Sequence, residues 1–407
     1  MGKWRPNDQR LGDFDDMLTI FDAILKREPM VRKTMQGMFD HLIVDEAQDL
    51  SGVQFSIISQ MSEHISDGHD GKSLWICGDD KQCVASDTKI TVGPSYTTVA
   101  SDLIPGSKVM AYRNGQLILQ TVRHVKPSSW TWGYKITTES GKQLTMSPNH
   151  KIWATQPEVP EGQVAVYLMY RHDMGFRVGI TNKGYSEDYY NSFGGRAFME
   201  KAERMWFLEI CSDREEALLK EVSYSLRFGV PTAVFGAENR GINQERIDAL
   251  FAEFGKNGGR ILEDKHLSFD LPHWMSRSYS KHGRLRRTIQ MIAHSSHNTQ
   301  VAMEWMGDDL DASLQAVSIS SEPTSKGTKR IRKWFSNYRE GLTFAEKLQE
   351  ATKANLQRRL STDEGALHLL TASALFPGMS VAVVQGDALV PEEIVSVEKV
   401  EGITFID

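Results

Sequence analysis

Cys83, Ser147 and His150 are residue types that could together rearrange a peptide bond. A cysteine thiolate attacks carbonyl carbons, so Cys83 could convert the Gln82–Cys83 amide into a thioester, an N-to-S acyl shift. In that chemistry His150 would protonate the departing Cys83 nitrogen, and Ser147 would polarise the Gln82 carbonyl. Because a free thiol titrates near about 8.5, the reaction needs local help. Taken singly, such a cysteine is more often a small core hydrophobe, and such a histidine a satisfied core or surface residue.

A second set of chemical residues follows two short apolar runs near the start of the chain. Asp45 and Glu46 follow the run 41–44, and the segment 78–82 follows the run 73–77. Such runs are typical of parallel strands buried on both faces, and helical spacing over 53–64 completes a strand–helix–strand unit. Acidic residues at strand carboxyl ends lie where open α/β sheets bind ligands. Asp45 could hold Mg²⁺ through water, Glu46 could activate a water, and the Gln82 amide could sense a terminal phosphate.

With Asp13-Phe14-Asp15-Asp16-Met17 upstream, these motifs resemble the UvrD/Rep-type superfamily 1 DNA helicases over residues 13–82. The resemblance implies an ATP-dependent hydrolase, with Asp45 and Glu46 as the Walker B pair and Gln82 in the motif that couples ATP to DNA. The sequence has no Gly-x-x-x-x-Gly-Lys-Ser/Thr loop to cradle phosphates. We therefore expect residues 1–82 alone not to hydrolyse ATP, which would be a cofactor of the complete host helicase only.

The pattern changes inside a motif, between Gln82 and Cys83, without the polar linker that usually separates domains. One protein inserted into another is the simplest interpretation. The runs Cys83-Val84-Ala85-Ser86-Asp87-Thr88 and Ser147-Pro148-Asn149-His150 resemble blocks A and B of an intein, on the Hint fold shared with Hedgehog autoprocessing domains. Ser147 stands where the family usually has Thr. The run 395–407 resembles the start of block F, and by this resemblance Asp407 is the acidic residue that assists the first step.

A further insert is expected inside the splicing region. Residues 166–171 and 176–181 resemble the opening hairpin of a GIY-YIG nuclease. By that resemblance Tyr167 is the general base, Arg196 stabilises phosphate charge, and Glu221, on a helix, binds one Mg²⁺. Ala165 replaces the first glycine of the motif, and Arg177 replaces its second tyrosine.

Two basic stretches, within 277–287 and 326–339, suggest contact with double-stranded DNA. Cations interleaved with aromatic residues suit phosphate contact and base stacking, although a solvated helix face gives the same pattern. A helix is predicted over 343–360, returning to the splicing fold. The predicted DNA-binding residues are Arg284, Arg286, Arg287, Lys329, Arg330, Arg332, Lys333 and Trp334.

Composition bounds these hypotheses. The chain has 407 residues, three cysteines and a formal net charge of −6, so DNA contact must come from local patches. No apolar run approaches the roughly 18 residues that span a bilayer, and neither a signal peptide nor a disulfide framework is visible, so we expect a cytoplasmic protein without a membrane partner.

The predicted fold class is multi-domain α/β plus β: a partial RecA-like parallel sheet, an all-β Hint splicing domain and an α/β GIY-YIG-like endonuclease insert. The expected domains are 1–82 (helicase), 83–160 (first Hint part), 161–290 (endonuclease), 291–360 (basic DNA-contact region) and 361–407 (second Hint part, truncated in block F). Its partners would be double-stranded DNA and the missing C-terminal intein and helicase segment. The alternatives are a Hedgehog-type autoprocessing domain and a non-catalytic DNA-binding insert on an inactive helicase fragment.

Overall fold

The computed structural model describes most of the chain, in two compact units that divide between Asp80 and Lys81. The second unit thus begins close to the junction expected at Gln82–Cys83. The described residues are 14–39, 41–44, 52–62, 73–76, 83–93, 96–113, 116–184, 193–236, 242–276, 287–294, 298–325, 327–386 and 388–407.

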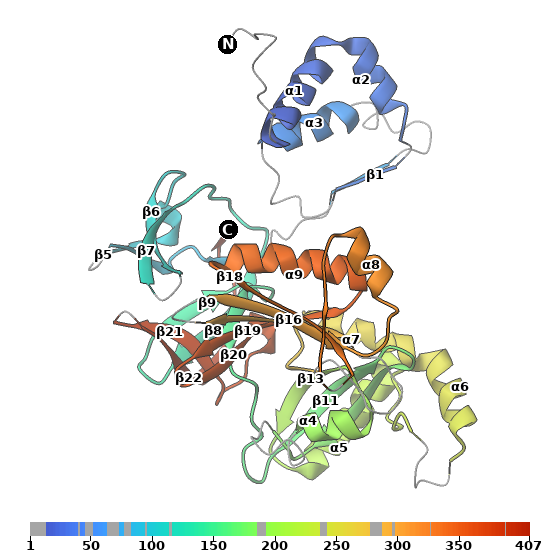
Figure 1. Cartoon of the computed structure of the whole chain (residues 1–407). Coiled ribbons are helices and arrows are strands. Elements are labelled where there is room, and N and C mark those ends of the chain that lie inside the picture. The colour runs from blue at the N-terminus through green and yellow to red at the C-terminus, as the bar shows by residue number, and fades with distance from the viewer. Residues whose placement is uncertain are drawn as a thin grey trace. The chain divides into compact units, whose positions relative to one another are not determined.

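The first unit contains the strand–helix–strand arrangement that the sequence predicts (Figure 1). Strands β1 (His41–Val44) and β2 (Ser73–Ile76) pair in parallel, with His41 opposite Ser73 and Val44 opposite Ile76. Helix α3 (Gly52–Ser62) connects them, and α1 (Phe14–Arg27) and α2 (Pro29–Gln36) precede them. Asp45, Glu46 and Gln82 lie outside the described residues.

The second unit is mixed α/β and is built around a large sheet whose strands come from both ends of the unit. Early strands are β3 (Val84–Ala85), β8 (Trp132–Thr138), β9 (Gln143–Met146) and β10 (Lys151–Ala154); late ones are β20 (Gly365–Thr371), β21 (Ser380–Gln385), β22 (Ala388–Glu401) and β23 (Phe405–Ile406). The two sets interleave, because β22 pairs with β8, β23 with β3, and β10 with both β20 and β21. The intervening chain is therefore an insertion between the two halves of one sheet.

Two hairpins lie between β3 and β8 in the chain, β4 (Lys89–Gly93) with β5 (Tyr96–Val99) and β6 (Lys108–Arg113) with β7 (Gln116–Thr121). Each also forms a separate antiparallel pair in the strand order. Short 3₁₀ turns η3 (Ala100–Asp102) and η6 (Ala372–Ala374) link strands at corresponding places in the early and late halves.

The inserted chain opens with a four-stranded antiparallel sheet in the order β12-β11-β13-β14. The hairpin predicted from 166–171 and 176–181 is β11 (Val164–Arg171) with β12 (Gly175–Thr181). The remaining elements are α4 (Phe193–Met199), β13 (Arg204–Cys211), α5 (Arg214–Phe228), α6 (Gln244–Phe254), η5 (Gly255–Gly258), α7 (Gly259–Asp264) and β14 (Trp274–Met275).

The last part of the insertion joins the large sheet. It comprises β15 (Thr288–His294), β16 (Thr299–Trp305), α8 (Asp311–Ala316), β17 (Glu322–Pro323), β18 (Lys329–Phe335), α9 (Tyr338–Thr352) and β19 (Asn355–Thr362). The helix predicted over 343–360 is thus wrong in its second half, because it ends at Thr352 and the chain continues as β19. The expected domain boundaries at 290/291 and 360/361 fall inside β15 and β19.

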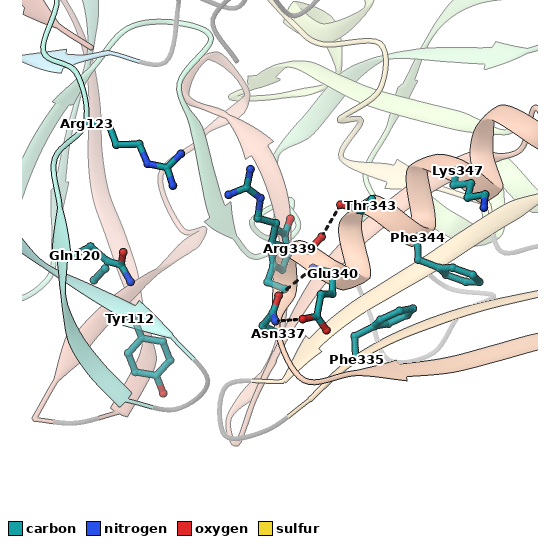
Figure 2. A pocket seen from close by; sticks show the side chains of 12 residues that line it. Tyr112, Gln120, Arg123, Phe335, Asn337, Arg339, Glu340, Thr343, Phe344 and Lys347 are labelled. Atoms are coloured by element: carbon teal, nitrogen blue, oxygen red, sulfur yellow. Dashed lines mark hydrogen bonds between the residues drawn. The ribbon is translucent and has the colours of Figure 1, made fainter. Parts of the chain in front are cut away.

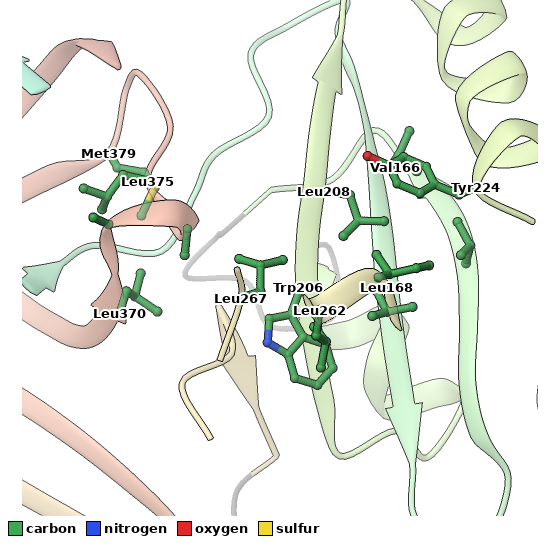
Figure 3. Close-up of a cluster of buried hydrophobic side chains, with 14 of the residues drawn as sticks. Val166, Leu168, Trp206, Leu208, Tyr224, Leu262, Leu267, Leu370, Leu375 and Met379 are labelled. Carbon is green, nitrogen blue, oxygen red and sulfur yellow. The ribbon is translucent and has the colours of Figure 1, made fainter. Parts of the chain in front are cut away.

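A hydrophobic cluster joins the inserted sheet to the strands of the large sheet (Figure 3). Val166, Leu168 and Trp206 supply one part of it, and Leu370 and Met379 supply another. Trp206 is completely buried, and truncating a buried tryptophan costs about 3–5 kcal/mol. Within the described parts of the chain, no helix is long and apolar enough to cross a bilayer.

Candidate functional site

The backbone of Cys83 is held directly by Ser147. The Cys83 amide N–H donates to Ser147 Oγ at 3.0 Å, and the Cys83 carbonyl accepts from the Ser147 amide at 2.9 Å. Both residues are fully buried. The nitrogen of Cys83 belongs to the peptide bond that the predicted acyl shift would break. The Ser147 hydroxyl therefore contacts the leaving nitrogen, whereas the sequence predicts a contact with the carbonyl of Gln82, which is not among the described residues.

His150 is placed by a tight turn that starts at Ser147. The His150 amide donates to the Ser147 carbonyl at 3.0 Å, and the His150 carbonyl accepts from the Ala372 amide at 2.8 Å. The turn joins β9 to β10, so the histidine is fixed between a strand of the early half and η6 of the late half. Cys83, Ser147 and His150 consequently belong to one local arrangement.

Asp407 reaches the same place through strand pairing. Ile406 lies opposite Val84 in the antiparallel pair of β23 and β3, so the register, continued by one residue, sets Asp407 opposite Cys83. Asp407 also exchanges backbone hydrogen bonds with Lys126, each of 2.9 Å. Cys83, Ser147 and Asp407 thus lie beside one another at the ends of β3, β9 and β23, and His150 follows Ser147 in the turn from β9 to β10.

The lack of a side chain at Gly133 allows close packing of the neighbouring strands. A Cβ at Gly133 would lie 2.1 Å from the Met146 carbonyl oxygen and 2.6 Å from the ring of Phe405. Phe405 is fully buried in a small cluster with Cys83 and Ala85. Only glycine allows β8, β9 and β23 to approach this closely.

A second group of polar side chains surrounds Tyr167 on β11. Arg177 Nη1 donates to Tyr167 Oη at 2.9 Å and to Glu200 Oε1 at 2.7 Å. Arg196 Nε donates to the same Glu200 oxygen at 3.0 Å. Tyr167 is fully buried, and the side chains of Arg177 and Glu200 are nearly so. A buried carboxylate bound by two guanidinium groups fixes the positions of both arginines.

The backbone around Tyr167 is adapted to its ring. Gly179 lies directly opposite Tyr167 in the β11–β12 pair, and a Cβ there would lie 2.4 Å from Tyr167 Oη. On the other side, the pairing of β11 with β13 shifts register between Val166 and Tyr167. Such bulges re-aim a side chain and often lie beside functional sites.

Glu221 lies on α5, which begins after the N-cap Asp213, whose side chain accepts from the Glu216 amide. Burial raises the pKa of Glu221, while the charges of Arg177, Arg214 and Arg196 oppose that increase. The charges of Arg177 and Arg196 thus act on Glu221. The hydrophobic residues of α5 nevertheless pack with Val166 and Leu168, whereas Tyr167 packs with α4 on the other face of β11.

Burial also raises the pKa of Tyr167, against the opposing charge of Arg177, so the phenol is protonated at neutral pH. Among the described residues no cluster of three or more His, Cys, Asp and Glu side chains gathers that could hold a metal ion. The single carboxylate of Glu221 would suit Mg²⁺ held mostly by water and a substrate phosphate.

Glu200 was not predicted from the sequence, although it makes the central contacts of this group. Its spacing of four residues from Arg196 is a weak signal, because such pairs are common on exposed helices. Arg177 stands out in the sequence only as a departure from a motif. Its contacts with Tyr167 and Glu200 depend on the β11–β12 register and on the position of the end of α4.

The predicted DNA-binding residues differ in their partners and in the face of the sheet on which they lie. Arg287 forms an ion pair with Asp309, and Lys329 pairs with Asp308 at 2.6 Å and with Asp311. Lys333 Nζ lies 4.9 Å from the ring centre of Phe344, on α9. Arg330, Arg332 and Trp334 alternate with these residues along β18 and point to its other face. Arg284 and Arg286 lie outside the described residues.

An open groove of about 970 Å³ lies between the β6–β7 hairpin and the start of α9 (Figure 2). Tyr112 and Arg123 line it on the hairpin side, and Arg339 and Lys347 on the helix side. Glu340, also in the lining, is bound to Asn337 at the helix N-terminus. The groove therefore carries more positive than negative charge.

Comparison with known proteins finds similarity to the N-terminal part of the chain. Residues 5–86 match the UvrD/REP helicase N-terminal domain family. A stretch of 77 residues is 34% identical to one of the ATP-dependent helicase/nuclease subunits of Leuconostoc mesenteroides subsp. mesenteroides, covering 19% of this chain and 6% of that relative. The chain thus spans only a small part of the length of this relative. Both matches support a UvrD-type DNA helicase fragment at the start of the chain.

Proposed function

We propose that the chain from Cys83 onward is a self-processing insert of intein type that interrupts a UvrD-type DNA helicase. The helicase assignment is supported by the match of residues 5–86. In the complete host helicase, Asp45 and Glu46 would act with Mg²⁺ and ATP, and DNA would be the substrate.

The observation that carries the proposal is the contact between the Cys83 amide and Ser147 Oγ, with Asp407 paired beside it. In the proposed step the Cys83 Sγ bonds to the carbonyl carbon of Gln82, and the carbon–nitrogen bond between the two residues breaks. The thiol proton leaves toward Asp407, and the released nitrogen gains a proton from His150. Ser147 holds that nitrogen during the step. The reaction rearranges bonds without any change of oxidation state.

The purified chain tests this proposal when it is incubated with dithiothreitol, which intercepts a thioester. We expect release of a fragment that ends at Gln82, identified by intact mass, and no release from Cys83→Ala. Cys211→Ala, which removes another buried thiol, is the matched control and should release the fragment like the wild type. Absence of the fragment from the wild type would contradict the proposal.

A Hedgehog-type processing domain would perform the same first step. The two differ in what receives the acyl group, because such a domain passes it to an external nucleophile. Expression of the complete gene distinguishes them: an intein joins Gln82 to the residue after the insert, and a Hedgehog-type domain leaves no ligated helicase.

We propose a second activity, cleavage of DNA phosphodiester bonds, for the group around Tyr167. It is supported by the buried contacts of Arg177 and Arg196 with Glu200, which hold two cations beside Tyr167, and by the effect of both charges on the pKa of Glu221. In this reaction a water oxygen bonds to phosphorus and the bond from phosphorus to the leaving sugar oxygen breaks. Arg196 stabilises the charge that develops on the phosphate, and Tyr167 in its ionised form takes the proton of the water.

Mg²⁺, when bound, would polarise the phosphate, and Glu221 is the residue that would hold it. Nicking of supercoiled plasmid in the presence of Mg²⁺ tests this activity. Glu221→Gln should abolish nicking, and Glu215→Gln, an exposed position at the start of the same helix, should retain it. Equal nicking by both variants would contradict the assignment and favour a non-catalytic insert.

A further inference from the structure

The sheet formed by β18, β16, β15 and β19 has two faces of different character. One face is covered by α9, which lies along β16 and β18 (Figure 1). Ile289, Met291 and Val301 are completely buried on that face and pack in one cluster with residues of α9. The covered face is therefore a hydrophobic core, with no role left for a ligand.

The opposite face is polar and uncovered by comparison. Strand register defines two rows across it, because Trp334 lies opposite Gln300, Arg332 opposite Ala302, and the rows continue onto β15 and β19. No member of the rows is buried: Arg332 and Trp334 are exposed, and the others are partly exposed. The first row is Trp334, Gln300, Ile292 and Arg359; the second is Arg332, Ala302, Gln290 and Gln357.

Trp334 is the most unusual member of this face. Its side chain is 53% exposed, although tryptophan is usually well covered. The ring stacks with that of His294, with ring centres 5.7 Å apart and planes 28° apart. A rigid aromatic surface is thus held in solvent at the end of the first row.

The composition of the face suits contact with the base edges that are exposed in a groove of duplex DNA. Arginine binds guanine and glutamine binds adenine through paired hydrogen bonds in the major groove, which admits a two-stranded β-ribbon. Arg332 and Arg359 supply positive charge that a phosphate backbone attracts. Glu304 on β16, one of the two strands between them, already accepts a hydrogen bond of 2.6 Å from Thr328. The Glu304 carboxylate therefore already has a hydrogen-bond donor within the protein.

We propose that this uncovered face, led by Arg332 and Trp334, reads the base sequence of duplex DNA. The proposal deepens the proposed DNA-cleaving function, on which it rests for its substrate class. It also divides the basic stretch 326–339 in two. Arg332 and Trp334 face DNA, whereas Lys333, between them, points to the covered face and packs on Phe344.

Binding and cleavage can be measured separately to test this proposal. The full chain, with Glu221→Gln to prevent nicking, is incubated without Mg²⁺ with short duplexes that carry a randomised central segment, and bound duplexes are sequenced. We expect a sequence preference in the parent protein. Arg332→Ala and Trp334→Ala should weaken binding of the selected duplex about 5- to 150-fold, the range given by loss of one base contact.

Lys333→Ala is the matched control, because it removes a cation from the same strand on the opposite face. It should change affinity by no more than about twofold. Arg332→Lys keeps the charge but loses the planar fork, so it should keep the salt dependence of binding and relax the preference at one base position. Circular dichroism checks that each variant is folded.

Equal weakening by Lys333→Ala and Arg332→Ala would overturn the proposal, as would unchanged binding in both Arg332→Ala and Trp334→Ala. Nicking by the Glu221-containing protein separates this result from the proposed function. If the chain nicks DNA but ignores these substitutions, the nuclease stands and the reading face is wrong. If it binds through Arg332 without nicking, the reading face stands and the nuclease is wrong.

Discussion

The Cys83 site and the Tyr167 site belong to the same unit of the chain, but they are assembled in different ways. The Cys83 site combines residues from distant parts of the sequence, and its described contacts are mostly made by backbone groups next to the ends of β3, β9 and β23. The Tyr167 site is built within 164–236, from side chains that bond to one another.

This difference predicts what each site depends on. A site made by strand pairing across the unit should fail when either end of the sheet is disturbed. A site made by a local charge network should survive that change, but should respond strongly to loss of one charged member.

The largest expected effect comes from Phe405→Asp, which places a charge in the fully buried cluster with Cys83. It should abolish thiol-induced release of residues 1–82 and leave plasmid nicking unchanged, because β23 does not contribute to the Tyr167 site. Val395→Asp, at an exposed position of β22, is the control and should release the fragment normally. Loss of both activities in Phe405→Asp would show that the two sites are not independent.

Arg177→Met tests the local charge network of the Tyr167 site. It removes the cation that links Tyr167 and Glu200 and leaves the carboxylate with fewer partners in a buried site. Breaking one partner of a buried charged pair costs about 3–5 kcal/mol, so chemical denaturation should show a loss of this size. Arg227→Met, which breaks an exposed pair with Asp264, should cost less than about 1 kcal/mol. Similar losses in both variants would contradict the described network.

His273 connects β13 of the inserted sheet to η6 in the late half of the large sheet, and it gives a pH-dependent effect of intermediate size. The Phe207 amide donates to its Nδ1 at 2.9 Å, and its Nε2 lies 2.7 Å from the Ala374 carbonyl oxygen. Burial lowers the pKa of His273 from 6.5 to about 4, against the opposing hydrogen bond to Ala374. The neutral ring satisfies both contacts, whereas a proton on Nδ1 would face the Phe207 N–H.

The unfolded chain therefore gains a proton on this histidine near pH 6.5, while the folded chain resists it until near pH 4. The contribution of the neutral His273 ring to the free energy of unfolding is fully present above pH 6.5. It is lost as the pH falls from 6.5 toward 4, by about 3 kcal/mol in all. Denaturant unfolding of wild type and His273→Gln, compared across this range, measures the contribution. Identical pH dependence of the two proteins would exclude it.

The smallest expected effect concerns the pH dependence of nicking. Because burial raises the pKa of Tyr167, the ionised phenol is rare at neutral pH. If Tyr167 takes the proton from water, the nicking rate should increase about tenfold for each pH unit above neutrality. Tyr167→Phe should remove that slope, and Tyr170→Phe, on the same strand, should retain it. A flat profile in the wild type would exclude Tyr167 as the base.

Local patterns predicted the elements of this structure better than its long-range contacts. The apolar runs predicted at 41–44 and 73–77 form β1 and β2 (Ser73–Ile76), and the predicted hairpin forms β11 and β12, because each rests on neighbouring residues. The predicted helix over 343–360 was wrong beyond Thr352. Leu356 and Leu360 have helical spacing, but both are even-numbered positions on one face of β19, so the same residues fit either period.

At the two sites as well, the sequence predicted individual residues better than their long-range contacts. Cys83, Ser147 and His150 could be chosen from residue type and motif, but the contact of Ser147 with the leaving nitrogen needs the pairing of β3 with β9. Glu200 has no distinctive motif, and its role follows only from the positions of Arg177 and Arg196. The division of β18 into a covered and an uncovered face likewise depends on where α9 packs.

The central claim is that Cys83 and His150 act together on the peptide bond between Gln82 and Cys83. Intact mass spectrometry after hydroxylamine treatment of the wild type and of His150→Ala tests it most directly. We expect the wild type to release residues 1–82 with a hydroxamate at Gln82, and His150→Ala to remain whole, because the leaving nitrogen then lacks its proton donor. Equal release from both proteins would contradict the claim.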